Sequence, residues 1–149
     1  MKRLVLDTSV IVEYIVDGRP YRTKVAKLFE KAEKGELELF ISAVTVSETL
    51  YVASRIYRKA GTSDPNSDAM DLLDWVSRRA RIVYVNEDIA LIAGELKKKL
   101  RIALADCYVI ATAKAINAVP LFRSEEKEME PFIEELRRYG VRFLNEITL

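Results

Sequence analysis

The sequence predicts an α/β protein with a mostly parallel sheet that carries helices on both of its faces. One pattern in the sequence, together with a general rule about parallel strands, leads to this fold class. Short apolar segments bounded by turn residues alternate along the chain with longer segments whose apolar residues recur at helical spacing. Parallel strands need crossover connections, usually helices, and these helices cover both faces of the sheet.

The N-terminal part of the chain contains two predicted strands and two predicted helices. The apolar run "RLVLD" predicts a buried strand over 3–7, and "VIVEYIV" predicts a short helix over 10–16 that ends at the turn residues "DGRP". Apolar residues at helical spacing predict a helix over 21–35, with Gly35 as its stop signal. The apolar segment "LELFIS" predicts a second strand over 37–42.

The middle of the chain repeats this alternation. Helical spacing predicts a helix over 44–59, and the turn-rich segment "AGTSDPNS" predicts a loop over 60–67. A further helix is predicted over 68–79, followed by a third strand over 81–85 with the sequence "RIVYV". The segment "EDIALIAGELKKKL" predicts a helix over 87–100.

The C-terminal part supplies the remaining elements. The nearly apolar segment 103–117 predicts a buried helix, and 118–123 predicts a fourth strand in which Pro120 indicates either an edge strand or a strand start. A proline near its first turn and a glycine just past its end predict a helix over 131–140. A last short strand is predicted over 141–145.

The composition limits the chemistry that this protein can use. Its 149 residues suit a single domain over 1–149, with half of the residues hydrophobic, 32% charged and a formal net charge of +1. The chain has one cysteine, Cys107, and no histidine, which excludes an intramolecular disulfide, a cysteine zinc cluster and a histidine base. Any catalysis must therefore rely on carboxylates, hydroxyls, Lys, Arg, Tyr or a bound metal.

The N-terminal sequence shows no sign of membrane targeting. Its apolar run is interrupted by Asp7 and Glu13, so it is too short and too charged for a signal peptide or a membrane span. We therefore expect a cytoplasmic protein with no membrane attachment. The abundance of Lys, Arg and Glu is also typical of thermophile proteins.

Asp7 is the first candidate functional acid. It follows the first predicted strand, and functional groups of parallel α/β proteins gather at the carboxyl ends of the strands. The alternative is a helix cap, because Asp, Thr and Ser are all good N-cap residues. If Asp7 has a functional role, we expect the cap to be supplied mainly by Thr8 and Ser9.

Glu48 is the second candidate acid. It shares one face of its predicted helix with Val44, Val52 and Ile56, and a carboxylate on an apolar face is costly to bury without a partner. The alternative is structural, because the spacing of Thr45 and Glu48 fits a capping box.

Asp106 is the third candidate, and it is the single charged residue of the segment "LADCYVIATA" over 104–113. Its helix is apolar on nearly every side, so the Asp106 carboxylate would be desolvated unless it opens into a polar site. A cap role at the start of a helical turn is the alternative.

A fourth acid is expected in the segment "FRSEEKEME" over 122–130, after the fourth predicted strand. Glu125, Glu126 and Glu128 are all candidates, and a Glu-rich segment of this kind also suits a solvated loop. If an acid from this segment meets the other three, their like charges require a cation. Carboxylate oxygens without histidine favour Mg²⁺ or Mn²⁺, and such ions assist attack on phosphate esters.

Four ordered segments give the chain its resemblance to PIN-domain ribonucleases, and more closely to the VapC toxins of VapBC toxin–antitoxin pairs. "LVLDTSVIVEYI" carries Asp7, "ISAVTVSETLYV" carries Glu48 and "LADCYVIATA" carries Asp106. "FRSEEKEM" is similar to the Thr-x-Asp-x-x-Phe segment of the family, with Ser124 at the Thr position, Glu126 at the Asp position and Met129 at the Phe position. A register shifted by one residue would nominate Glu125 in place of Glu126.

The resemblance implies a single PIN domain, a three-layer α/β/α sandwich with a central sheet of four to five strands. It further implies hydrolysis of RNA phosphodiester bonds with Mg²⁺ or Mn²⁺, a homodimer and a small antitoxin partner. Asp7, Glu48, Asp106 and Glu126 would be the metal ligands and catalytic acids. Thr8, Ser9 and Ser124 would support them through hydrogen bonds.

Two points stay open at the level of sequence. The basic residues Lys97, Lys98, Lys99 and Arg101 could contact RNA phosphates, or the lysines could simply complement the C-terminus of a helix. A PIN nuclease for RNA processing outside a toxin–antitoxin pair, or a catalytically weak PIN binding module, are the alternatives to a toxin.

Overall fold

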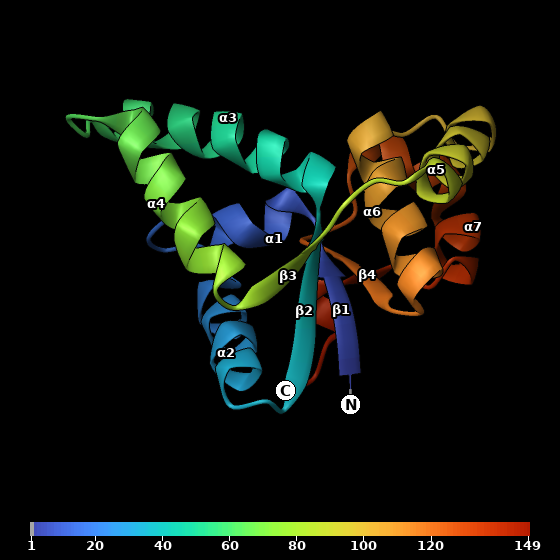
Figure 1. Ribbon diagram of the computed structural model, residues 1–149, viewed down its shortest axis with the longest axis horizontal. Helices are drawn as coiled ribbons and strands as arrows, with labels where there is room; N and C mark the ends of the chain where they lie inside the picture. The colour runs from blue at the N-terminus through green and yellow to red at the C-terminus, as the bar shows by residue number, and fades with distance from the viewer. Residues whose placement is uncertain (1) are drawn as a thin grey trace.

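The computed structural model describes residues 2–149, which fold around a five-stranded sheet in the order β3-β2-β1-β4-β5 (Figure 1). Every pairing between neighbouring strands is parallel, which confirms the predicted sheet. The strands are β1 (Lys2–Leu6), β2 (Leu37–Ser42), β3 (Ala80–Val83), β4 (Val119–Phe122) and β5 (Arg142–Phe143).

Helices cover both faces of the sheet, as a parallel sheet requires (Figure 1). Side chains alternate along β1, so Leu4 and Leu6 belong to one buried cluster and Val5 to the other. The first cluster receives residues from α1 (Thr8–Glu13), α2 (Arg22–Glu33), α3 (Ala43–Ala60) and α4 (Pro65–Ser77). The second receives residues from α5 (Glu87–Lys99), α6 (Leu104–Ile116) and α7 (Ile133–Arg138). These two clusters confirm the three-layer α/β/α sandwich.

The order of the strands reverses between β1 and β4. The chain first moves from β1 outward to β2 and β3, and then crosses to the other side of β1 to form β4 and β5. Ligand sites of open parallel sheets lie beyond the carboxyl ends of the strands at such a reversal. Asp7, the first residue after β1, is fixed there because its backbone N–H donates to the Leu121 carbonyl of β4 at 2.9 Å.

The start of α1 corrects the prediction for the segment after Asp7. The helix begins at Thr8 and ends at Glu13, whereas we expected it over 10–16. Its N-cap is Asp7, whose side chain accepts a hydrogen bond from the backbone N–H of Ser9 at 3.0 Å. The expected caps Thr8 and Ser9 lie inside the first turn of the helix, so that part of the prediction is wrong.

Two corrections in the middle of the chain also have local causes. The predicted loop over 60–67 is shorter, because α4 begins at Pro65 with Asp64 as its N-cap, an arrangement that suits proline in the first helical turn. Strand β3 ends at Val83 rather than at position 85, because its last partner, Ser42, is also the last residue of β2.

The C-terminal corrections concern prolines and short elements. Strand β4 lies between β1 and β5, so Pro120 does not mark an edge strand, and its pairing with β5 begins only at Leu121. The predicted helix over 131–140 is divided into a 3₁₀ helix (η1, Lys127–Phe132) that contains Pro131, followed by α7. Strand β5 is short because a second 3₁₀ helix (η2, Leu144–Glu146) follows it directly.

None of the helices formed by residues 2–149 combines the length and the apolar character that crossing a bilayer demands.

Candidate functional site

An open cavity of about 270 Å³ lies beyond the carboxyl ends of the central strands. It brings together acids from four different parts of the chain, and we call it the acidic cavity. Its lining residues are Asp7, Thr8, Ser9, Val12, Glu48, Val52, Ala103, Asp106, Glu126 and Glu128.

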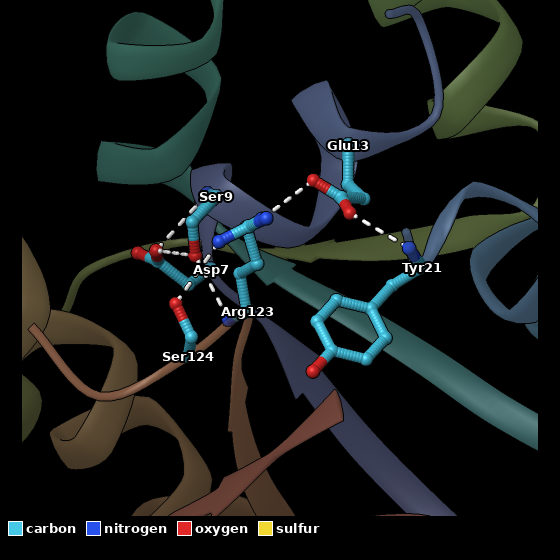
Figure 2. Close-up of polar contacts among 6 residues, drawn as sticks. All are labelled: Asp7, Ser9, Glu13, Tyr21, Arg123 and Ser124. Carbon is cyan, nitrogen blue, oxygen red and sulfur yellow. Dashed lines mark hydrogen bonds and ion pairs between the residues drawn. The ribbon is translucent and has the colours of Figure 1, made fainter. Parts of the chain in front are cut away.

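Asp7 enters the cavity from the end of β1, and only 3% of it is exposed. Its Oδ2 atom accepts hydrogen bonds from the Ser9 hydroxyl at 2.6 Å and from the Ser9 backbone N–H at 3.0 Å (Figure 2). Its Oδ1 atom is buried and has no hydrogen-bond partner among the residues that the structure describes. Burial raises the pKa of Asp7 from 3.8 to about 6, although the hydrogen bonds from Ser9 oppose the shift.

Asp106 faces the cavity from the first turn of α6, and it is 6% exposed. It does not cap this helix, since the N-cap position is Ala103. Its Oδ2 atom is buried without a hydrogen-bond partner within residues 2–149. Burial, followed by the nearby charges of Asp7 and Glu126, raises the pKa of Asp106 from 3.8 to about 8.

Glu48 lines the cavity from α3, where its side chain is partly buried. The helix begins at Ala43, and its N-cap is Ser42, whose hydroxyl accepts a hydrogen bond from the Val44 backbone N–H at 3.1 Å. Thr45 therefore lies within the helix, and the capping box that we considered for Thr45 and Glu48 is not formed. The functional explanation for Glu48 remains.

The segment after β4 contributes two acids to the cavity, Glu126 and Glu128. Carboxylate oxygens of Asp106, Glu126 and Glu128 lie within 4.8 Å of one another. Partial removal from water, hydrogen bonding with Glu128 and the charge of Asp7 raise the pKa of Glu126 from 4.5 to about 7. The third acid of the segment, Glu125, is not among the lining residues in the described part of the chain. The structure thus separates Glu125 from Glu126 and Glu128, which the sequence could not do.

The supporting hydroxyls behave differently from one another. Ser9 holds Asp7, as expected. The Thr8 hydroxyl instead lies 3.3 Å from the Thr49 hydroxyl, and the Ser124 hydroxyl accepts a hydrogen bond from the Arg123 guanidinium at 3.1 Å. Ser9 is therefore the one of these three hydroxyls that contacts a cavity carboxylate in residues 2–149.

Sequence reasoning gave no role to an ion pair between a buried glutamate and a partly buried arginine beside the cavity. The Glu13 carboxylate, whose side chain is 1% exposed, lies 2.6 Å from the Arg123 Nε atom (Figure 2). Its second oxygen accepts a hydrogen bond from the Tyr21 backbone N–H at 2.9 Å. One charge within the apolar run "VIVEYIV" was the only signal in the sequence.

The predicted basic residues lie at the C-terminus of α5. Lys97 donates to the Ile102 carbonyl, and Lys98 forms an ion pair with Glu95 at 3.1 Å. A second open space, which we call the basic hollow, adjoins the acidic cavity and shares Glu128 with it. The basic hollow is lined by Lys98, Lys99, Arg101, Glu128, Pro131 and Phe132.

The acidic cavity fits a hard divalent cation. Asp7 and Asp106 each bury a carboxylate oxygen that lacks a donor among residues 2–149, and buried carboxylates without donors are costly. The raised pKa values of both groups express that cost in the metal-free protein. The ligands on offer are all oxygen atoms, which Mg²⁺ and Mn²⁺ prefer.

Comparison with known proteins found a match to the PIN domain family model over residues 4–130. A search of curated proteins found no match. Solved structures with a similar fold include FitAcB from Neisseria gonorrhoeae. Its TM-score is 0.68 at 20% identity, and the match covers 97% of this chain and 99% of that chain.

Two further structures extend this comparison. A toxin–antitoxin complex from Klebsiella pneumoniae has a TM-score of 0.65 at 18% identity, covering 97% of this chain and 99% of that chain. The VapC20 toxin of Mycobacterium tuberculosis, which cleaves the sarcin–ricin loop, has a TM-score of 0.63 at 12% identity, covering 87% and 94%. At these identities the structures show a common fold.

Proposed function

The chain belongs to the PIN domain family, and from this premise we propose that it is a divalent-metal-dependent endoribonuclease that hydrolyses RNA phosphodiester bonds. One observation carries the proposal. Two buried carboxylate oxygens, Asp7 Oδ1 and Asp106 Oδ2, line one cavity at the reversal of strand order, and residues 2–149 supply no donor to either.

Asp7, Asp106 and Glu126 would hold Mg²⁺ or Mn²⁺, with Glu128 beside them as a further oxygen donor. When bound, such an ion lowers the pKa of water and offsets negative charge that develops on a phosphate. Glu48 lies on α3, in the helical layer opposite to that of α6 and Asp106, and would orient the attacking water. Ser9 keeps the Asp7 carboxylate in one orientation through its two hydrogen bonds.

We further propose that the protein is the toxin of a toxin–antitoxin pair. In support, its fold matches a toxin–antitoxin complex and an RNA-cleaving VapC toxin over most of both chains. The proposal includes a small antitoxin partner, a homodimer, a single PIN domain over 1–149 and action in the cytoplasm. An RNA-processing role outside such a pair would leave the chemistry of the acidic cavity unchanged.

The assay that tests the nuclease proposal compares RNA cleavage by the purified protein with Mn²⁺ and with EDTA. We expect cleavage with Mn²⁺, products that carry a 5′-phosphate, loss of cleavage in EDTA and recovery when excess Mn²⁺ is restored. Cleavage that persists in EDTA, or that leaves a cyclic phosphate, would refute the proposed chemistry.

Two neighbouring glutamates provide a matched pair of variants for this assay. Glu126→Gln removes a cavity carboxylate, and we expect a loss of activity of roughly tenfold to a hundredfold. Glu125→Gln removes a carboxylate of the same segment that does not line the acidic cavity, and we expect wild-type activity. The opposite result would identify Glu125, and not Glu126, as the fourth acid of the site.

The basic hollow offers a path for the RNA backbone next to the acidic cavity. Replacing Lys99 and Arg101 together with alanine should weaken RNA binding about tenfold at low salt and reduce the salt dependence by about 1.4 in log–log slope, the value for two phosphate contacts of a single strand. Fluorescence anisotropy with a metal-free protein and a labelled RNA measures both. The control is Lys27→Ala, an exposed lysine of α2, and equal binding by the two variants would exclude this path.

A further inference from the structure

Glu13 is a buried acid that does not line the acidic cavity, yet its contacts lead to it. Burying a carboxylate costs several kcal/mol unless it is paired, so the ion pair with Arg123 at 2.6 Å and the Tyr21 N–H at 2.9 Å are required for its burial. Buried ion pairs are on balance no more stabilising than apolar side chains of similar size. The fold alone therefore gives little reason for a Glu–Arg pair at this place.

Arg123 is fixed on several sides. Its side chain bonds Glu13 and donates to the Ser124 hydroxyl at 3.1 Å, and its guanidinium lies 5.6 Å from the centre of the Tyr21 ring. Its backbone carbonyl accepts a hydrogen bond from the Leu144 N–H at 3.2 Å. The residue directly after β4 is thus attached to the end of α1 as well as to the chain beyond β5.

The same residue controls one acid through Ser9. The Arg123 backbone N–H donates to the Ser9 hydroxyl at 3.1 Å, and that hydroxyl donates to Asp7 Oδ2 at 2.6 Å (Figure 2). The Ser9 hydroxyl has a single proton, so its acceptance from Arg123 directs that proton toward Asp7. This arrangement leaves Asp7 Oδ1 as the oxygen without a partner among residues 2–149.

Arg123 also fixes the start of the backbone segment that leads to a second acid, Glu126. Glu126 follows it by three residues, and the Glu126 carbonyl then accepts the Met129 N–H at 2.9 Å, at the start of η1. The path from Arg123 to η1 is short, so holding Arg123 fixes the backbone position from which the Glu126 side chain projects toward the acidic cavity. A single ion pair thereby fixes acids that follow two different strands.

We propose that the Glu13–Arg123 ion pair positions Asp7 and Glu126 relative to each other and so sets the affinity of the acidic cavity for its cation. This inference rests on the proposed metal-dependent function. Glu13 and Arg123 are positioning residues, because they act through Ser9 and through the segment that leads to Glu126.

The test uses Glu13→Gln, which keeps the size of the side chain and an oxygen for the Tyr21 N–H but removes the charge that holds Arg123. The matched control is Glu33→Gln, which removes the acid of another Glu–Arg pair. In that pair a Glu33 carboxylate oxygen lies 2.7 Å from Arg79 Nε, and neither residue lines the acidic cavity. The measurements are the Mn²⁺ dissociation constant by titration calorimetry, kcat and KM for a short RNA, and the melting temperature.

We expect Glu13→Gln to raise the Mn²⁺ dissociation constant about tenfold and to lower kcat at fixed Mn²⁺ by a similar factor, with KM for RNA unchanged. Glu33→Gln should leave the Mn²⁺ dissociation constant, kcat and KM at wild-type values. Arg123→Lys keeps a positive charge opposite Glu13 but cannot reproduce the planar guanidinium that also reaches Ser124, so it should also weaken Mn²⁺ binding. This second variant keeps the proposal testable if Glu13→Gln fails to fold.

The possible outcomes separate the two proposals. If wild-type protein binds Mn²⁺ and cleaves RNA while Glu13→Gln and Arg123→Lys match it in affinity and kcat, the pair has only a structural role and the inference is wrong, whatever the melting temperatures. If wild-type protein neither binds Mn²⁺ nor cleaves RNA, the proposed function itself fails, and the inference with it.

Discussion

Asp106→Asn is expected to abolish RNA cleavage and, in the absence of divalent cations, to stabilise the fold. The first effect follows from the loss of a cavity carboxylate. Charge stabilisation by a bound ion is worth several kcal/mol, so a loss of about 4 kcal/mol would reduce the rate by roughly a thousandfold. The second effect follows from burial, because the Asp106 carboxylate has no donor at Oδ2 within residues 2–149 and lies near other acids.

The sign of the stability effect is fixed by the pKa of Asp106. That pKa is about 8 in the folded protein against an ordinary value of 3.8, so the folded state holds a proton that the unfolded state releases between these limits. The free energy of unfolding of the wild type therefore falls as pH rises through this range. The gain from Asn should be absent near pH 4, grow up to about pH 8 and then level off.

Thermal melts in EDTA at pH 4 and pH 8.5 measure this gain, alongside cleavage assays with Mn²⁺. Asp71→Asn, at an exposed position of α4, is the control and should change neither property. A variant at Asp106 that cleaves RNA at the wild-type rate, or that melts below the wild type at pH 8.5, would contradict the assignment of Asp106 as a buried metal ligand.

Three of the acids could be predicted because local sequence constrains them strongly. Asp7 directly follows an apolar strand, and Asp106 is the only charged residue of the apolar segment 104–113. Each carboxylate therefore either faces a polar site or is buried at a cost in free energy. Glu48 shares a face with apolar residues at helical spacing. In each case a few neighbouring residues held the information, and the structure places all three at one cavity.

The segment after β4 could not be resolved from sequence for a physical reason. Glu125, Glu126 and Glu128 lie in a polar stretch without periodicity, and only the backbone path into η1 decides which carboxylates face Asp106. The ion pair of Glu13 and Arg123 was beyond reach for a different reason. Its partners are 110 residues apart, and they meet only because β4 returns beside β1.

The error at the start of α1 shows how one residue can serve two purposes. The sequence allowed Asp7 to combine a cap with a functional role, but we expected the cap mainly at Thr8 and Ser9. Asp7 has two carboxylate oxygens, and Oδ2 caps the helix through Ser9 while Oδ1 remains without a donor within residues 2–149. The cap therefore orients the acid, and the structural and functional explanations apply to different atoms.

Mn²⁺ should stabilise the protein strongly at alkaline pH and little at acidic pH. Asp7, Glu126 and Asp106 have pKa values of about 6, 7 and 8, so protons compete with the cation over this range. In the metal-free protein these raised values make the free energy of unfolding fall as pH rises above about 4. A cation that binds only the folded state raises the free energy of unfolding by about 2.7 kcal/mol when its free concentration is one hundred times its dissociation constant.

Melting temperatures with EDTA and with Mn²⁺ at pH 5 and pH 8.5 measure this linkage. At pH 8.5 we expect Mn²⁺ to raise the melting temperature by roughly 5–10 °C for a chain of this size, and at pH 5 by far less. Asp106→Asn should lose most of the Mn²⁺ effect while keeping its own gain in EDTA, because the two effects share one carboxylate. An equal Mn²⁺ shift at both pH values would mean that the cation binds elsewhere, since the pKa values of Asp7, Glu126 and Asp106 all lie between these two pH values.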